Sequence, residues 1–364
     1  MGLRGNRGEW SEVYVLVYLL GTGKLYLADA NLDRLSDDAF FSILAVYRKE
    51  GARYIKYVLS NLDNEEKVVL ISVDDVQMRQ LTCHELVSEA KGLLNSIITS
   101  RSGNGAFSIP RSEDVLSLLE CRTLRALSND KTDISLKIKD CLTGYIQRCG
   151  FSIKSQLGNP PTLLNASKAT NFQYQIQGMN DSLMDSINSI DSRTKINDRM
   201  LAIHKSNAVL SFKCMKNTTF SNNMLFIDSN MDRILSEMLI TYYSTKSNKC
   251  RDVIERLERL NPLNFPSTGY YTFKFKKFLT SVALGMMPST PWNGKEDANG
   301  GYIVVKQNGD VLAYHLYQRD FFEDFLLDST KFDTPSSSRN QYMFVYKEND
   351  DYFIDLNLQI RFLN

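Results

Sequence analysis

The sequence has few of the residues that build metal clusters or disulfide scaffolds. Its six cysteines never occur in CxxC spacing, and it contains only three histidines in 364 residues. Neither a zinc site nor a disulfide framework is therefore predicted. No apolar run reaches the eighteen or so residues that a membrane helix needs, and Glu9 and Glu12 interrupt the N-terminal apolar stretch, which argues against a signal peptide. These absences favour a protein of the reducing cytoplasm with no membrane partner.

Glutamate is missing from a long internal segment. No glutamate occurs from Cys121 to Ser236, and residues 121–216 hold fourteen Lys and Arg against seven Asp. The whole chain has a net charge of only +1, so this surplus of seven positive charges is local. A basic segment of this kind can neutralise nucleic-acid phosphates, although a solvated basic face is an alternative interpretation.

The residue patterns that are present predict a mixture of helices and strands. The composition, 43% hydrophobic and 23% charged, is typical of a globular protein. Gly21–Lys24 lacks the spacing of a phosphate-binding loop and is interpreted as a turn. The order of elements predicts an α/β or α+β fold. Helices are expected at 8–20, 37–50, 83–99, 112–126, 180–204, 229–260, 270–284 and near 319–327, and strands at 53–59, 67–72, 170–176, 208–213 and in four stretches of the last sixty residues.

One stretch, TDISLKIKDCLTGYIQRCGFSIKSQLG, predicts a hairpin that carries polar residues on one face. It begins at Thr132 and consists of two alternating apolar runs separated by Thr143-Gly144. A two-residue turn there would set Asp133 opposite Lys154. The period of two places Ser152, Lys154 and Gln156 together on one strand face.

This hairpin has part of the chemistry that phosphodiester cleavage needs. A hard divalent cation requires oxygen ligands, which the Asp133 carboxylate and the Ile153 carbonyl can supply. A cation such as Lys154 can orient water or offset charge on the phosphoryl oxygens. The structural alternative is a cross-strand ion pair on a solvated face, which would contribute less than about 1 kcal/mol.

The chain also resembles a known family. An aspartate followed by x-x-Lys on a neighbouring strand is similar to the PD-(D/E)xK nuclease core. Five segments in order resemble HpaII-type restriction endonucleases from Gly5 to Phe362: GNRGEWSEVYVLVYLL, TDI…GFSIKSQLG, PTLLNASKATNFQYQI, ALGMMPSTPWNGKEDANGGYIVVK and TPSSSRNQYMFVYKENDDYFIDLNLQIRF. The resemblance implies a mixed central sheet flanked by helices, and Mg²⁺-dependent cleavage of double-stranded DNA at a short palindrome such as CCGG.

The (D/E)xK motif of the family contains an acid that this chain lacks. Ser152 stands where the (D/E)xK motif has its carboxylate, so Asp133 and a carbonyl would hold Mg²⁺ weakly. Glu9 and Glu12 lie on the first helix, the element that packs against the catalytic sheet in such nucleases, and are the expected donors. Helix N-terminal electrostatics is the alternative role for both, and Asp181 is a less favoured substitute.

The resemblance predicts DNA contacts and an assembly as well. Residues 1–220 are expected to form the nuclease core and 221–364 a helical segment with a strand-rich recognition part, with one compact domain as the alternative. A palindromic site favours a homodimer on DNA, and the host would need a matching DNA methyltransferase. A non-catalytic DNA-binding protein with a decayed site, a scaffolding protein and an RNase are the rival functions. Candidate DNA-binding residues are Arg7 and members of three polar loops: Asn165, Ser167, Lys168, Thr170 and Asn171; Thr290, Trp292, Asn293 and Lys295; and Thr334, Ser336, Ser337, Ser338, Arg339 and Asn340.

Overall fold

The chain is a mixed α/β protein whose contacts divide it into two compact units. The structure, a computed structural model, describes residues 3–61, 66–100, 105–110, 112–126, 132–245 and 247–363. Unit 1 combines Met1–Pro161 with Glu296–Phe325, and unit 2 combines Thr162–Lys295 with Leu326–Leu363. This division differs from the expected boundary at residue 220, because residues 162–220 contribute strands that pair with the C-terminal part of the chain.

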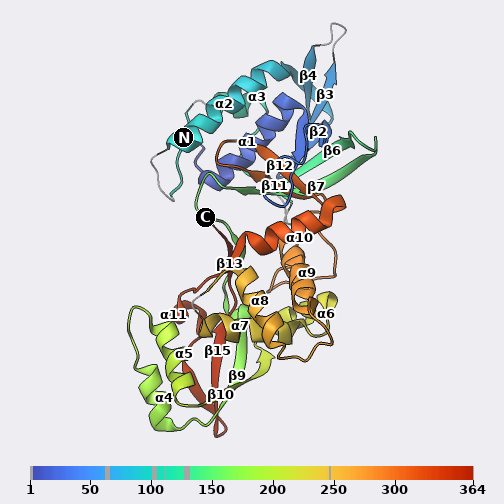
Figure 1. Cartoon of the computed structure of the whole chain (residues 1–364). Coiled ribbons are helices and arrows are strands. Elements are labelled where there is room, and N and C mark those ends of the chain that lie inside the picture. The colour runs from blue at the N-terminus through green and yellow to red at the C-terminus, as the bar shows by residue number, and fades with distance from the viewer. Residues whose placement is uncertain are drawn as a thin grey trace. The chain divides into compact units, whose positions relative to one another are not determined.

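Unit 1 is built on a sheet of nine strands within the described residues (Figure 1). The strand order is β1-β12-β11-β7-β6-β2-β3-β4-β5, and β7 pairs in parallel with β11 and antiparallel with β6. The strands are β1 Lys24–Leu27, β2 Phe40–Glu50, β3 Arg53–Asn61, β4 Lys67–Val73, β5 Val76–Thr82, β6 Ile134–Asp140, β7 Ile146–Ser155, β11 Gly301–Val305 and β12 Val311–His315.

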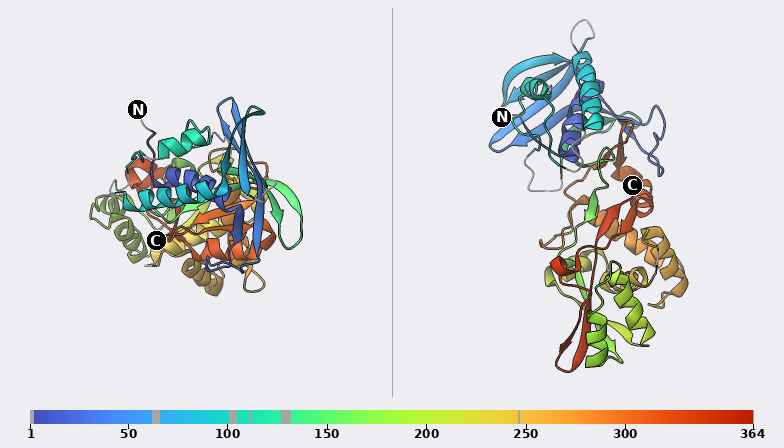
Figure 2. Two further views of the ribbon diagram at one scale, coloured as in Figure 1. Left: turned by 90° about the horizontal axis from the view of Figure 1, so that it is seen from above. Right: turned by 90° about the vertical axis from the view of Figure 1, so that its left-hand side faces the viewer.

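Helices α1 (Arg7–Thr22) and α2 (Cys83–Thr99) pack on one face of this sheet, as both views in Figure 2 show. Helix α1 begins at an Asn6 capping box, in which Asn6 Oδ1 accepts from the Glu9 N–H and Glu9 Oε2 accepts from the Asn6 N–H. It ends at Gly23, whose φ of 64° suits glycine. Gly21 lets α1 approach α2 closely, because a Cβ there would lie 2.8 Å from the Val87 nitrogen.

Two helix predictions in this unit are wrong. Residues 37–50 contain the strand β2, which lies between β6 and β3 and alternates buried and less buried positions. The run FFSILAVYRKE is rich in β-branched and aromatic residues, which favour a strand in a central position. The predicted helix 112–126 is α3 (Ser112–Leu118) only, and Glu120 follows at a φ of 58° that no helix continues.

The hairpin predicted from Thr132 onward forms, but its predicted register is wrong by two residues. Ile134 pairs with Phe151, and the Asp133 N–H donates to the Phe151 carbonyl at 2.9 Å, which sets Asp133 beside Ser152. The connection holds four residues, Cys141–Gly144, because Asp140 still bonds to Tyr145. A shift of two keeps every side chain on its predicted face.

Unit 2 contains two smaller sheets and most of the remaining helices. Asn171 to Gln177 form its central strand β9, which pairs with β10 (Val209–Met215) and β15 (Asp351–Asn357). The other strands are β14 Val345–Glu348 beside β15, and β13 Thr330–Phe332, β16 Ile360–Phe362 and β8 Thr162–Leu164 in a three-stranded sheet. The helices are α4 Asp181–Asn188, α5 Lys195–Lys205, α6 Thr218–Ile227, α7 Met231–Ser244, α8 Cys250–Leu260, α9 Tyr270–Leu284 and α11 Ser337–Asn340, and α10 (Arg319–Asp328) begins in unit 1 and ends in unit 2.

Several other helices and strands predicted from the sequence are present in the structure. The helices expected at 8–20, 83–99 and 270–284 are present, and the expected strands at 53–59, 67–72, 170–176 and 208–213 are β3, β4, β9 and β10. The turn expected at 61–66 lies largely outside the described residues. Among the helices that the structure describes, none has the length and apolar content to span a membrane.

Candidate active site

Three polar side chains of the hairpin are joined in a short chain of hydrogen bonds. Ser152 Oγ donates to Asp133 Oδ2 at 3.0 Å and accepts from Lys154 Nζ at 3.0 Å. The Ile153 N–H also donates to Asp133 Oδ2, at 2.6 Å. The Ser152 hydroxyl, only 2% exposed, thus holds a carboxylate and an ammonium on the same side of the sheet. Asp133, Ser152, Ile153 and Lys154 are therefore brought together.

Glu12 is the N-terminal acid that faces this group. Burial, with a smaller contribution from the nearby Asp133 carboxylate, raises the pKa of the Glu12 carboxyl to about 8. Arg125 opposes this shift, with its Nε 3.9 Å from Glu12 Oε1. Two carboxylates that interact in a buried place create a local excess of negative charge, which a divalent cation relieves.

Glu9 has a different set of contacts. Its Oε2 closes the capping box of α1, and its Oε1 lies 3.1 Å from Arg125 Nε. Both carboxylate oxygens therefore have partners at the start of the helix. Of the two expected donors, Glu12 is the one coupled to Asp133.

Lys154 is buried within the same group. Burial lowers the pKa of its ammonium, while Asp133 and Glu12 oppose that shift. Its Nζ lies 5.2 Å from the centre of the Tyr302 ring, which β11 places beside Ser152. Tyr302 is a neighbour of the site that the sequence patterns did not indicate, because its contact depends on the parallel pairing of β11 with β7.

A cavity of about 310 Å³ opens beside these residues, entirely within unit 1. Gln156, expected to join the catalytic group, lies beyond the end of β7 and is exposed, and it does not line this cavity. The lining residues are Asn6, Arg7, Gly8, Glu12, Arg125, Ile153, Lys154, Ser155, Gly158, Asn159 and Pro161.

Arg7 also lines the cavity, but its terminal nitrogens are used structurally. Nη1 donates to the Leu157 carbonyl at 3.0 Å and Nη2 donates to the Ser100 carbonyl at 2.9 Å. These bonds tie the start of α1 to the segment after β7 and to the end of α2. Arg7 Nε is buried and has no hydrogen-bond partner among the described residues.

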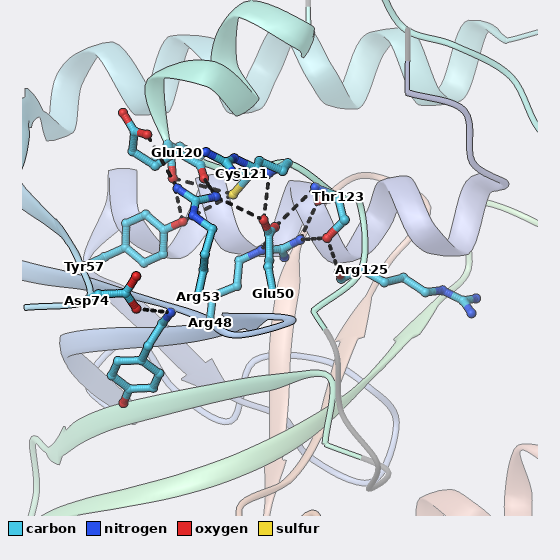
Figure 3. Close-up of polar contacts among 12 residues, drawn as sticks. Arg48, Glu50, Arg53, Tyr57, Asp74, Glu120, Cys121, Thr123 and Arg125 are labelled. Atoms are coloured by element: carbon cyan, nitrogen blue, oxygen red, sulfur yellow. Dashed lines mark hydrogen bonds and ion pairs between the residues drawn. The ribbon is translucent and has the colours of Figure 1, made fainter. Parts of the chain in front are cut away.

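A buried polar cluster positions the segment that carries Arg125 (Figure 3). Arg48 Nε lies 2.7 Å from Glu50 Oε1, and both side chains are nearly inaccessible. Glu50 accepts backbone N–H groups from Arg122 at 2.8 Å and from Thr123 at 3.3 Å. Arg48 Nη2 donates to the Thr123 carbonyl. The cluster fixes this loop on the sheet, and Figure 3 shows the Arg125 side chain extending away from it.

Two of the three expected recognition loops are joined inside unit 2. Asn171 Nδ2 donates to the Asn340 carbonyl at 2.9 Å, and Asn357 Nδ2 donates to Asn171 Oδ1 at 2.6 Å and to Thr170 Oγ1 at 3.1 Å. Thr170, Asn171 and Asn340 are buried, so these side chains brace the loops from within. Asn357, which the sequence patterns did not indicate, is the centre of this network.

The remaining members of these two loops divide into caps and exposed side chains. Ser167 caps the short helical turn at Lys168–Thr170, and Ser336 caps α11 with the buried Ser337 as its first residue. Thr334 Oγ1 bonds to the Tyr242 hydroxyl at 2.7 Å. The side chains that remain exposed are Asn165, Lys168, Thr334, Ser336, Ser338 and Arg339.

The third loop is held by Asn223, a residue that the sequence patterns also missed. Its Nδ2 donates to the Thr290 carbonyl at 2.9 Å, and its Oδ1 accepts from the Trp292 N–H at 3.0 Å. The Trp292 indole donates to the Lys295 carbonyl at 2.7 Å. Thr290, Asn293 and Lys295 are exposed on this folded loop.

The donor set for a metal is small. Within the described residues no group of three or more His, Cys, Asp or Glu side chains is placed to hold a metal ion. Asp181, the less favoured substitute, belongs to unit 2, where the Tyr352 hydroxyl donates to it at 2.7 Å. Two carboxylates and a carbonyl remain, and this set fits a Mg²⁺ ion that keeps several of its waters.

Comparison with known proteins connects this geometry to an enzyme family. The model of the HpaII restriction endonuclease family matches residues 6–362. The chain is 44% identical over 362 residues to a protein described as type II restriction enzyme HpaII, from Haemophilus parainfluenzae, covering 99% of this chain and 98% of that protein. No solved structure matches the chain.

Proposed function

Because the chain belongs to the HpaII restriction endonuclease family and is a type II restriction enzyme, we propose that it cuts both strands of DNA in a magnesium-dependent reaction at a short palindrome, CCGG. Its products are 5′-phosphate and 3′-hydroxyl ends. The observation that carries this proposal is the Asp133–Ser152–Lys154 chain of hydrogen bonds with Glu12 coupled to it. A non-catalytic DNA-binding protein, the alternative that Ser152 left open, does not agree with membership of an enzyme family.

We assign the hairpin to the PD-(D/E)xK type of nuclease core. Asp133 provides the first acid, and Ser152-Ile153-Lys154 provides the second half of the motif with a hydroxyl in place of a carboxylate. Glu12 supplies the missing acid from α1. In support of this assignment, Glu12 is coupled to both Asp133 and Lys154.

Asp133, Glu12 and the Ile153 carbonyl would hold the magnesium ion. When bound, the ion supplies polarisation of a phosphate oxygen and activation of water. The chain's own contribution is to keep Asp133 oriented, since both bonds from Ser152 and Ile153 end on its Oδ2. Lys154, held by Ser152, offsets the charge that develops on the phosphoryl oxygens as water adds and the P–O3′ bond breaks.

The direct experiment measures DNA cutting by Asp133→Ala and Lys154→Ala. Each variant should lower the cutting rate by about a thousandfold or more, because each removes a group that acts on the reacting phosphate. Specific DNA binding and the circular dichroism spectrum should change little. Asp185→Ala and Lys91→Ala, at exposed positions on α4 and α2, are matched controls that should cut normally. Normal turnover by either site variant would contradict the assigned role.

The DNA and its assembly are part of the same proposal. The exposed loop residues Asn165, Lys168, Thr290, Asn293, Lys295, Ser338 and Arg339 are the candidates for base and phosphate contacts. We further propose a homodimer on DNA, a cytoplasmic location and a host methyltransferase that protects the same site. Sequencing the ends of a digested plasmid tests the site and the position of the cut together.

A further inference from the structure

Five basic side chains gather on one face of the sheet in unit 1, and we call this surface the basic face. Leu136 and Ile138 of β6 point into the core with α1, so Lys137 and Lys139 point to the opposite face. Strand pairing sets Arg148 beside Lys137. The basic face consists of Lys49, Lys56, Lys137, Lys139 and Arg148, of which all but the half-buried Lys56 are exposed.

The basic face has no acidic residue to balance it within its four strands. The positions of β2, β3, β6 and β7 that share this face carry no Asp or Glu, all within the described part of the chain. Asp133 and Asp297 border it at the end where the candidate catalytic group lies, and Asp74, which accepts from the Tyr54 N–H at 2.8 Å, borders it at β3. Charge of one sign that ends at a catalytic carboxylate fits a polyanion that passes through the site.

Arg148 is held in a fixed orientation at the centre of this face. Its guanidinium carbon lies 3.8 Å from the centre of the Tyr47 ring, and Nη2 donates to the Tyr54 hydroxyl at 2.9 Å. Its Nε donates to Ser135 Oγ at 3.2 Å. A guanidinium that is oriented by an aromatic ring and two hydroxyls is pre-organised to bind a phosphate.

The basic face continues directly into the candidate active site. A cavity of about 550 Å³ is lined by Tyr47, Tyr54 and Arg148 and also by Asp133. Ser135, which accepts from Arg148, lies two residues after Asp133 in extended chain, a separation of about 7 Å. Arg148 and Asp133 are therefore close enough to contact neighbouring nucleotides of one strand.

We propose that the basic face binds the phosphate backbone of double-stranded DNA next to the phosphodiester that is cut. The inference rests on the proposed function, and it adds a surface outside the three polar loops of unit 2. Its contribution to binding is electrostatic and independent of base sequence, because cations that pair with phosphates carry no sequence information. Its role is to hold the DNA strand at the entrance to the Asp133 site.

The test is the salt dependence of DNA binding by the triple variant Lys137→Gln/Lys139→Gln/Arg148→Gln. Kd is measured in EDTA by fluorescence anisotropy, on one duplex that contains CCGG and one that does not. Each lost phosphate contact should reduce the slope of log Kd against log salt by about 0.9, hence by nearly 3 in total. Both duplexes should lose affinity equally, since phosphate contacts carry no sequence information.

A double variant and a control separate binding from folding. Lys137→Gln/Lys139→Gln leaves the Arg148 contacts intact and should reduce the slope by about 2. Lys91→Gln, an exposed lysine on the helical face, should leave the slope unchanged. If the double variant folds normally and binds with the parent slope, the basic face is not a DNA surface. Failure of the parent protein to cut any DNA would instead overturn the proposed function.

Discussion

At the scale of single residues, the site depends on how one hydroxyl replaces a carboxylate. Under the proposed assignment Ser152 stands where the nuclease motif has an acid, and in the structure it bonds to both Asp133 and Lys154. A hydroxyl can donate to a carboxylate and accept from an ammonium at the same time, which a carboxylate cannot do. The negative charge that this position lacks is available from Glu12.

Substitution of the two N-terminal acids should separate their roles. Glu12→Gln should reduce the cutting rate by about a hundredfold or more and raise the magnesium concentration needed for half-maximal activity. Glu9→Gln should cut almost normally and should lower the free energy of unfolding by at most about 1 kcal/mol, because glutamine keeps the capping acceptor but loses the negative charge at the helix N-terminus. Plasmid cleavage across a magnesium titration measures the first effect and urea unfolding the second. The reverse pattern would assign the metal role to Glu9.

The raised pKa of Glu12 also predicts how stability depends on pH without metal. The carboxyl has a pKa of about 8 in the folded chain and an ordinary value of 4.5, so the folded state binds the extra proton between these values. This group's contribution to stability is therefore fully present below about pH 4.5 and is lost as pH rises towards 8, by at most about 1.4 kcal/mol per pH unit.

Thermal melting in EDTA across this pH range measures the effect, with Glu12→Gln as its control. The variant should show a smaller loss of stability with rising pH, because a glutamine does not titrate. Added magnesium should stabilise the parent protein more strongly at higher pH, since the ionised carboxylate is the ligand. Identical pH profiles for parent and variant would show that Glu12 titrates normally.

At the scale of elements, the sequence predicted local structure better than pairing. The apolar run of residues 8–20 places α1 correctly, and period two assigns the correct faces to β6 and β7. The register of the hairpin was not predictable from the Thr143-Gly144 pair, because a four-residue loop also places Gly144 at a positive φ of 73°. The position of the Tyr302 ring beside Lys154 depends on a parallel pairing between strands about 150 residues apart, which no local pattern encodes.

The buried ion pair between Arg48 and Glu50 holds the loop that contains Arg122 and Thr123 against β2, and this contact gives a prediction about stability. Glu50→Ala should lower the free energy of unfolding by about 3–5 kcal/mol, because Arg48 would remain buried without its partner. It should also weaken cutting, since Arg122 and Thr123 lose the acceptor that fixes the Arg125 segment. Urea unfolding measures the first effect, and Glu89→Ala, at an exposed position of α2, should change stability by less than about 0.5 kcal/mol. A loss below 1 kcal/mol for Glu50→Ala would show that the pair does not brace the loop.

At the scale of the whole molecule, each chain contains one complete candidate site, and a palindrome has two strands to cut. All the groups of that site belong to unit 1. Two chains related by a two-fold axis would place one site on each strand.

Analytical ultracentrifugation with a CCGG duplex in EDTA should therefore find two chains for each duplex. A duplex with one half-site altered should bind more weakly and be nicked, because only one chain is then seated correctly. A single chain per duplex, with nicked DNA accumulating before linear DNA, would indicate that one protomer cuts the two strands in turn.

The parallel pairing of β7 with β11 has a consequence for the order in which the protein is made. Lys154 and its hairpin are synthesised before residues 162–295, yet the strand beside them begins only at Gly301. During translation the hairpin therefore has an open edge until nearly five-sixths of the chain has left the ribosome. A chain that stops before β11 would lack Tyr302, the ring beside Lys154, so truncated products should be unable to damage the genome of the cell that makes them.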